Sequence, residues 1–339
     1  MTRMPLPRFT VLLLALIPLA GCSMDKPGQS APAISPPTSG GKAATYKIAG
    51  MGFQNDQFFK IAEFGMKDAA AKNSVELSLA NSGGSLEKEL SLIDTYVAAK
   101  VDAIVMAPTN PKASTSALER ANKAGIKVVT YNDAIEADFP ASTIKSDQVS
   151  LGKATGEEAV KYIQEKMGGK ATVAVITYES FLPDQAGERT KGFVDEVSKL
   201  PGVKVVAKQD AWMADKAISV VDGILAAHPD VNLIWAANEG GTVGAVTAVR
   251  NAGKAGKIAV FGTDISDQLA GFLVSDDNVL QAVTGQKPFD IASRALETAV
   301  KALKGEKVEK MVLLPGELFS RRTPDAVKKY QEYLRTLAK

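Results

Sequence analysis

The sequence predicts an α/β fold made of two similar lobes, each a doubly wound parallel sheet with helices on both faces. Short apolar, β-branched runs alternate with longer stretches whose apolar residues recur at helical spacing, which is typical of βαβ units. The alternation runs from residue 46 to about 144, and the same pattern repeats from about 170 to 274. With 339 residues, the chain is long enough for more than one domain.

The N-terminal segment has the features of an export signal. Arg3 and Arg8 precede an apolar run over 11–20 that ends just before Cys22, the only cysteine of the chain. About ten apolar residues are too few to cross a bilayer, which needs roughly twenty. We therefore predict a secretory signal peptide over 1–21.

Cys22 and the residues after it predict a lipid anchor and a tether. The end of the signal resembles a bacterial lipobox, which implies that Cys22 is acylated; a plain signal peptide cut nearby is the alternative. Residues 22–43 are rich in Pro, Gly, Ser and Ala and bury too little apolar surface to fold, so we expect a flexible tether. The protein is expected to be exported, periplasmic or on the cell surface, and held to the membrane by lipid alone.

The body is read as strands followed by helices. In the first helix, Phe58, Ile61 and Ala62 begin an apolar stripe, with Asp56 placed to cap its start. A second helix over 85–99 is expected to turn Ile93 and its apolar neighbours inward. Further helices are expected over 113–124, 150–166 and 292–304. The predicted strands are 46–52, 75–79, 103–107, 127–131, 172–177, 203–207, 232–237, 258–262, 279–283 and 311–314.

Composition and motifs argue against several functions. The net charge is +2, with charges interspersed, so a clustered basic patch for nucleic acid is not expected. With His228 the only histidine, we expect neither a zinc site nor a histidine-based triad. Gly50 and Gly52 start a dinucleotide-type loop, but Asn55 stands where its third glycine belongs, so no cofactor is expected. Paired carboxylates for glycoside hydrolysis remain possible by count, without a supporting motif.

Polar and aromatic side chains follow the predicted strands. In open parallel sheets, ligands bind beyond the carboxyl ends of the strands. Carboxylates, amides and an arginine can each bond two neighbouring hydroxyls, and flat rings stack on the apolar face of a sugar. The same residues also serve as helix caps, turn residues or core, and the local sequence leaves both roles open. The residues placed this way are Asp56, Phe58, Phe59, Asn132, Asp133, Arg189, Asn238, Asp264 and Gln286.

Several of these motifs resemble those of bacterial periplasmic sugar-binding proteins of the ribose-binding type, which serve ABC importers. The resemblance covers nearly all of 46–310. It rests on the stretches 55–59, 124–132, 188–193, 237–239, 261–264 and 286–288. It implies a type I periplasmic binding fold, two lobes joined by several chain crossings, and hinge closure around a ligand.

The resemblance also implies residue roles. Phe58 and Phe59 would cover the apolar face of the sugar, and Asp56 stands where the family often has Asn. Arg189 would fork onto the ring oxygen or hydroxyls. Asn238, Asp264 and Gln286 would hold hydroxyls from the other lobe and the hinge side.

One departure from the family pattern concerns the ligand. The ribose type usually has Asp-Arg after the fourth strand, whereas this chain has Asn132 and Asp133. A sugar pocket remains expected, with ribose itself in doubt. Trp212 lies near a stretch that supplies a further aromatic in the family. The lobes implied are 44–145 with 287–314, and 146–286 with 315–339.

These observations predict a solute-binding protein, not an enzyme. It would capture a sugar or sugar-like molecule, act as a monomer, need no cofactor or metal, and hand the ligand to an ABC permease. A sensory or quorum-signal receptor, or a nucleoside-binding protein, would use the same cleft and remains an alternative.

Overall fold

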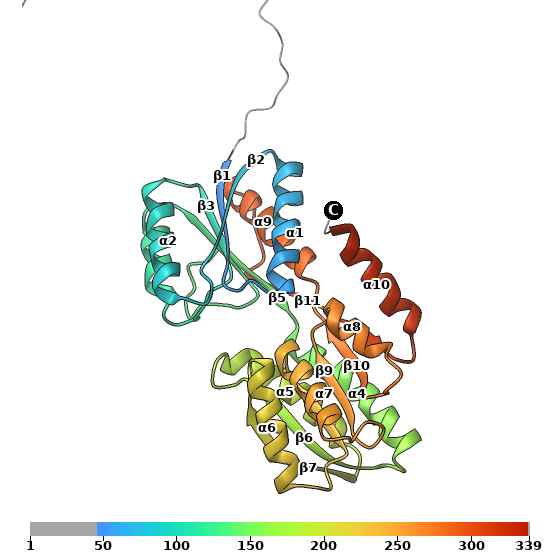
Figure 1. Ribbon diagram of the computed structural model, residues 1–339. Coiled ribbons are helices and arrows are strands. Elements are labelled where there is room, and N and C mark those ends of the chain that lie inside the picture. The colour runs from blue at the N-terminus through green and yellow to red at the C-terminus, as the bar shows by residue number, and fades with distance from the viewer. Residues whose placement is uncertain (1–45, 338–339) are drawn as a thin grey trace, which may run out of the picture. The chain divides into compact units, whose positions relative to one another are not determined.

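The computed structural model describes residues 46–337, which form two six-stranded sheets (Figure 1). The predicted signal peptide, Cys22 and the predicted tether lie outside the described residues. Ten helices and twelve strands occur within 46–337. The two-lobed α/β fold predicted from the sequence is confirmed.

The first sheet has the strand order β11-β5-β4-β3-β1-β2, with all neighbours parallel. Its strands are β1 (Tyr46–Gly52), β2 (Val75–Asn81), β3 (Ala103–Met106), β4 (Lys127–Tyr131), β5 (Ser142–Ser146) and β11 (Met311–Leu314). Its helices are α1 (Gln57–Asn73), α2 (Leu86–Ala98), α3 (Thr115–Lys123) and α9 (Pro288–Leu303).

Helices cover both faces of this sheet because successive residues of each strand point to opposite sides. On β1, Ile48 packs in one core cluster with α1 and α9, while Ala49 packs in another with α2 and α3. Figure 1 shows α2 and the α1–α9 pair on opposite sides of these strands. The chain therefore builds two apolar layers from one sheet.

The second sheet has the order β12-β10-β9-β8-β6-β7, in which only β12 runs antiparallel to its neighbour. Its strands are β6 (Lys170–Thr177), β7 (Gly202–Asp210), β8 (Leu233–Ala236), β9 (Ala259–Thr263), β10 (Leu280–Gly285) and β12 (Glu317–Ser320). Its helices are α4 (Gln148–Lys166), α5 (Pro183–Val197), α6 (Ala214–Ala227), α7 (Glu239–Asn251), α8 (Asp267–Leu273) and α10 (Pro324–Leu337).

The chain passes between the sheets three times. It leaves the first sheet after β5 to enter α4, returns after β10 to enter α9, and leaves again between β11 and β12. The lobe boundaries expected from the resemblance fall in these three segments and stay a prediction.

The sequence reading missed two strands, β5 and β12. The β5 segment contains three hydroxyl residues, so its pattern is not apolar, yet the structure buries it between β4 and β11. The Thr130 and Thr143 hydroxyls satisfy each other at 2.6 Å across the β4–β5 pair. Polar residues enter the core here because a neighbouring strand supplies their hydrogen bond.

Two helix details were tested directly. The predicted cap is confirmed, since Asp56 accepts the Phe59 N–H at 3.1 Å at the start of α1. In α2, Ile93 is buried as expected, but Glu89 is also fully buried. Glu89 accepts the Thr109 N–H at 2.6 Å and the Ser114 hydroxyl. The carboxylate is tolerated inside because both oxygens are hydrogen-bonded.

Candidate functional site

A cavity of about 580 Å³ lies between the two sheets, lined by residues that follow the strands of both. Eight of the nine residues selected from the sequence line it: Asp56, Phe58, Phe59, Asn132, Arg189, Asn238, Asp264 and Gln286. Parallel strands bring their carboxyl ends to one edge, which gathers side chains that are far apart in the sequence. Asp133 is the exception and does not line the cavity.

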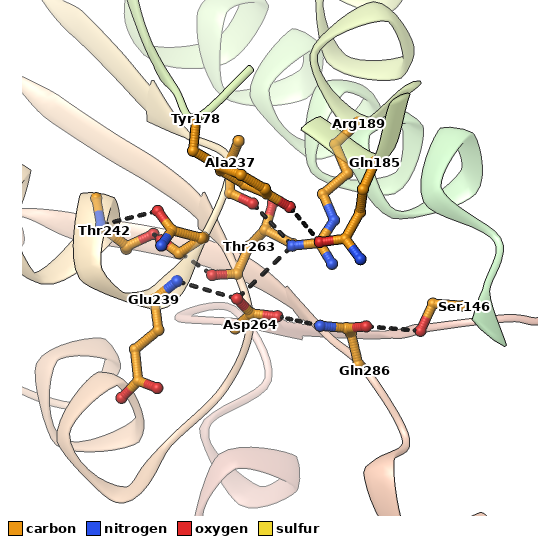
Figure 2. Close-up of polar contacts among 12 residues, drawn as sticks. Ser146, Tyr178, Gln185, Arg189, Ala237, Glu239, Thr242, Thr263, Asp264 and Gln286 are labelled. Atoms are coloured by element: carbon orange, nitrogen blue, oxygen red, sulfur yellow. Dashed lines mark hydrogen bonds and ion pairs between the residues drawn. The ribbon is translucent and has the colours of Figure 1, made fainter. Parts of the chain in front are cut away.

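Arg189, on α5, is held rigidly at the cavity wall and is only 1% exposed. Its Nε donates to Gln148 Oε1 at 2.5 Å and its Nη1 to the Ala237 carbonyl at 2.9 Å. Its guanidinium lies 5.8 Å from the Tyr178 ring centroid. Figure 2 shows Tyr178 and Ala237 beside the arginine, with Ala237 joined to it by a hydrogen bond.

Asp264 links the arginine to the segments that join the lobes (Figure 2). Its Oδ2 lies 3.7 Å from Arg189 Nη1 and accepts the Glu239 N–H at 3.0 Å. Its Oδ1 accepts from Gln286 Nε2 at 2.7 Å, and Gln286 Oε1 in turn accepts the Ser146 hydroxyl at 2.9 Å. Ser146 ends β5 and Gln286 follows β10, so the chain of hydrogen bonds connects the cavity to two crossing segments.

Both side-chain groups of Asn238 are hydrogen-bonded within the protein. It is the N-cap of α7, where its Oδ1 accepts the Gly241 N–H at 3.0 Å and its Nδ2 donates to the Trp212 carbonyl at 2.9 Å. It lines the cavity, but its amide is committed to holding α7 and the Trp212 segment in place. The structure thus gives it the capping role that the sequence left open.

Asn132 and Asp133 differ in their placement. Asn132 has the left-handed φ of 65°, and its main-chain carbonyl accepts a hydrogen bond from Gln185 Nε2 at 3.2 Å. Asp133 is 6% exposed, and its Oδ1 accepts the N–H of Ala134 at 2.9 Å. Burial raises the pKa of Asp133. Asp133 does not line the cavity, and its Oδ1 is used by the local turn; its role at the ligand stays a prediction.

Aromatic rings line the cavity from both sides. In the first lobe, Phe59 packs edge-on against Phe53, with ring centroids 4.7 Å apart, and against Phe58 at 5.1 Å. In the second, Tyr178 and Trp212 meet edge-on at 4.7 Å. The cavity therefore offers apolar surfaces on opposite walls and polar groups at the strand ends.

Besides the hydrogen bond between Gln185 and Asn132 described above, two contacts join the lobes across the cavity. Gln54, on the first-lobe side, donates from Nε2 to Asp56 Oδ2 at 2.9 Å and accepts the Trp212 indole N–H at 3.1 Å, in the amide orientation that satisfies both groups. Gln57 Oε1 accepts the N–H of Asp267 at 3.0 Å.

The cavity wall carries an unequal set of charges. Its acidic lining residues are Asp56, Glu239 and Asp264, and its only basic one among the described residues is Arg189. Burial raises the pKa of Asp56 and of Glu239, and the nearby charge of Asp264 raises both further. These two carboxylates therefore lie where ionisation is costly.

Sequence reasoning missed several lining residues. It did not select Gln54, Tyr178, Gln185 or Glu239, and left Trp212 unassigned. Tyr178 and Glu239 directly follow strand segments that had been identified, so position after a strand was the available signal. Gln185 could not be found that way, since it lies inside α5 and reaches the cavity through the packing of that helix.

Metal sites and membrane-spanning helices are two further features that the described residues do not contain. Within 46–337 no group of three or more His, Cys, Asp or Glu side chains is arranged to hold a metal ion. No helix in this part of the chain combines the length and apolar character needed to cross a bilayer.

Comparison with known proteins gives consistent results. The family described as "Periplasmic binding protein domain" matches residues 50–307. The ABC transporter periplasmic-binding protein YphF of Escherichia coli (strain K12) is 35% identical over 268 residues, covering 76% of this chain and 80% of that protein. The ribose import binding protein RbsB of Bacillus subtilis (strain 168) is 29% identical over 310 residues, covering 91% and 96%.

A solved structure shares the architecture. A periplasmic solute-binding protein of an ABC transporter from Actinobacillus succinogenes, with bound D-allose, superposes with a TM-score of 0.76 at 25% identity, covering 83% of this chain and 99% of that one.

Proposed function

The chain belongs to the periplasmic binding protein domain family, and we propose that it is an exported solute-binding protein that captures a sugar-like molecule and delivers it to an ABC importer. The observation that carries this proposal is the network of Arg189, Asp264 and Gln286 at the wall of a cavity between two lobes. The relatives named above bind ribose or D-allose or serve ABC transporters by their names, which supports the same role here.

The cavity has the chemistry that a sugar requires. Arg189 and Asp264 present a donor and an acceptor within one rigid network, and adjacent hydroxyls can pair with both at once. Phe58 and Phe59 face this network from the other lobe and would cover the apolar face of the ring. Binding would then combine fixed hydrogen bonds with ring stacking, and little ordering of side chains would remain to oppose it.

Hinge closure is the proposed mechanism of capture. The chain crosses between the sheets three times, and Gln286 and Ser146 lie at two of these crossings. A ligand bonded to groups of both lobes favours the conformation in which both contact it. Since the cross-cavity bonds are few, made by Gln54, Gln57 and Gln185, the ligand's own contacts would dominate the closed form.

A binding role is favoured over catalysis by the residues at the cavity. Its lining side chains among 46–337 include no histidine, cysteine, serine, threonine or lysine. The usual nucleophiles and the usual general base are therefore missing from the wall. A sensory receptor would use the same cavity, and none of the described contacts favours it over transport.

The proposal includes export and a lipid anchor at Cys22, supported by the signal-like segment that precedes it. Intact mass measurement of the protein from membranes tests the anchor. We expect an acylated N-terminal cysteine, and release of the Cys22→Ala variant from the membrane fraction.

Thermal unfolding against a panel of pentoses, hexoses, polyols and nucleosides tests the binding function. A ligand at a hundredfold excess over its dissociation constant adds about 2.7 kcal/mol to the stability of the folded state. We expect one compound to raise the unfolding midpoint, with the shift lost in Arg189→Ala and Asp264→Ala and kept in Asp222→Ala, an exposed position on α6. The same shift in all three variants would contradict the assigned site, and no shift across the panel would contradict the ligand class.

A further inference from the structure

The charge balance of the cavity wall is the starting point. The whole chain has a net charge of +2, yet the wall gathers three acidic side chains and a single basic one among the described residues. The acids also come from both lobes, since Asp56 precedes α1 while Glu239 and Asp264 follow β8 and β9. The excess of negative charge is thus local to the cavity.

Arg189 does not neutralise this excess. Of the three carboxylates, only Asp264 has a basic partner within 4.0 Å in the described chain, and that partner is Arg189. Asp56 and Glu239 have no such partner. Hydrogen bonds from Phe59 N–H and from the Ser266 hydroxyl stabilise their ionised forms, but neither bond supplies a positive charge.

The segment after β4 supplies no compensating positive charge. The family pattern has Asp-Arg there, one charge of each sign, whereas this chain has the neutral Asn132 at the cavity and Asp133 outside its lining. Asp133 is turned to the backbone of Ala134. A neutral ligand closing this cavity would leave two carboxylates without a basic partner and with less water around them, which is unfavourable.

The Arg189 side of the cavity calls for a hydrogen-bond acceptor rather than a cation. Arg189 has a side chain only 2% exposed, and its Nη2 donates no hydrogen bond within residues 46–337. This buried donor is oriented by the two bonds that its other nitrogens make. It suits a hydroxyl or ring oxygen, so one end of the ligand is expected to be a neutral polyol.

We propose that the ligand is a sugar or cyclitol carrying a protonated amino group, with the ammonium between Asp56 and Glu239 and its hydroxyls toward Arg189 and Asp264. This inference rests on the proposed function and narrows its substrate class. An ammonium has three donors and a full positive charge, so it can pair with both carboxylates at once.

Matched ligand pairs test the charge requirement. Titration calorimetry on the purified protein compares D-glucose with its 2-, 3- and 6-amino-deoxy derivatives, and scyllo-inositol with scyllo-inosamine. Charge-assisted hydrogen bonds are roughly twice as strong as neutral ones, so we expect at least one amino compound to bind about tenfold more tightly than its parent. The preference should shrink as salt is added.

Isosteric variants assign the effect to the two carboxylates. Glu239→Gln and Asp56→Asn keep the shape and one acceptor oxygen but remove the charge, and should lower the affinity for the amino compound about tenfold while changing that for the parent little. Asp222→Asn, exposed on α6, should change neither affinity.

Each outcome decides one of the two proposals. A parent sugar that binds as tightly as every amino derivative would overturn the amine requirement and leave the sugar-binding function standing. Equal losses for both ligands in the two variants would also overturn it. If no member of either set binds while another sugar of the thermal-unfolding panel does, the amine requirement is overturned and the sugar-binding function stands; if nothing in the panel binds either, the proposed function fails, and the inference with it.

Discussion

Gly152 holds two helices close together and thereby positions the arginine of the cavity, so Gly152→Ala is expected to perturb both stability and binding. A Cβ added at Gly152 would lie 2.9 Å from the Arg189 carbonyl carbon and 2.9 Å from the Phe193 nitrogen, and closer still to the Arg189 carbonyl oxygen. Gly152 is in α4, and these atoms belong to α5. The backbones of the two helices therefore meet where only glycine fits.

The size of the disturbance follows from these distances. Carbon atoms pack best at about 3.5–4.0 Å, so α5 must move away from α4 by at least about 0.6 Å. Overpacking of this kind costs about 1–3 kcal/mol, and backbone atoms cannot rotate aside as a side chain can. Because α5 carries Arg189 and α4 carries Gln148, the 2.5 Å bond between them is strained or lost.

Urea unfolding measures the first effect and ligand titration the second. We expect the free energy of unfolding of Gly152→Ala to fall by about 2–3 kcal/mol, and the affinity for the ligand found in the panel to fall at least about tenfold, since binding sites lose function when their groups shift by more than about 0.5 Å.

Gly187→Ala is the matched control. Gly187 also lies in α5, two residues before Arg189, and an added Cβ there meets nothing within 4 Å. Alanine favours a helix over glycine by up to about 1 kcal/mol, so this variant should be as stable as the native protein or more so. If Gly152→Ala matched Gly187→Ala in stability and in affinity, the close crossing of α4 and α5 would not be what positions Arg189.

Three further predictions concern single residues. Burial raises the pKa of Asp133 above its ordinary 3.8, so ionisation destabilises the fold as pH rises through the raised value. Asp133→Asn should therefore unfold at higher urea than the native protein at pH 7, with no difference below about pH 3.8. An equal difference at both pH values would refute the cause. Trp212 lines the cavity whereas Trp235 is fully buried, so a ligand-induced change in fluorescence should vanish in Trp212→Phe and persist in Trp235→Phe, and the reverse pattern would contradict the site. Glu89→Ala leaves the buried Thr109 N–H without its acceptor, whereas the Ser114 hydroxyl keeps the Asn110 carbonyl; this should cost about 1–3 kcal/mol in urea unfolding, while Glu89→Gln, which keeps one acceptor, should cost clearly less.

Much of the fold was predictable because strands and helices each produce a characteristic local spacing of apolar residues. A strand buried on both faces is a short apolar run, and β1, β4 and β11 were placed with their observed bounds. The helix cap at Asp56 was also visible, because a cap needs only one side chain and the backbone three residues on.

The missed strand β5 shows where local pattern ends. Its Ser142, Thr143 and Ser146 make it look like a loop, and its place in the sheet depends on β4 and β11, the latter more than 160 residues away. The Thr143 hydroxyl is acceptable inside because its partner, Thr130, comes from another strand. No property of the segment taken alone distinguishes it from a surface turn.

The cavity residues likewise separate into those that the sequence could place and those that it could not. The sequence was enough to place Arg189, Asp264 and Gln286 near one another, since carboxyl ends of parallel strands and the helices after them meet at one edge. It could not tell a residue that faces the cavity from one that serves the local backbone, because Asn238 and Asp133 carry the same polar atoms in either role.

Sequence alone therefore established the two-lobed α/β fold and eight of the residues around the cavity, because both follow from alternation and strand order. Only the tertiary structure decided the remainder: that Gln148 orients Arg189, that Glu239 lines the same cavity as Asp56, and that Asp133 does not line it. The physical reason is that hydrogen-bond partners and charge neighbours are set by distance in space, and the close approach of helices such as α4 and α5 depends on backbone contacts that no local pattern records.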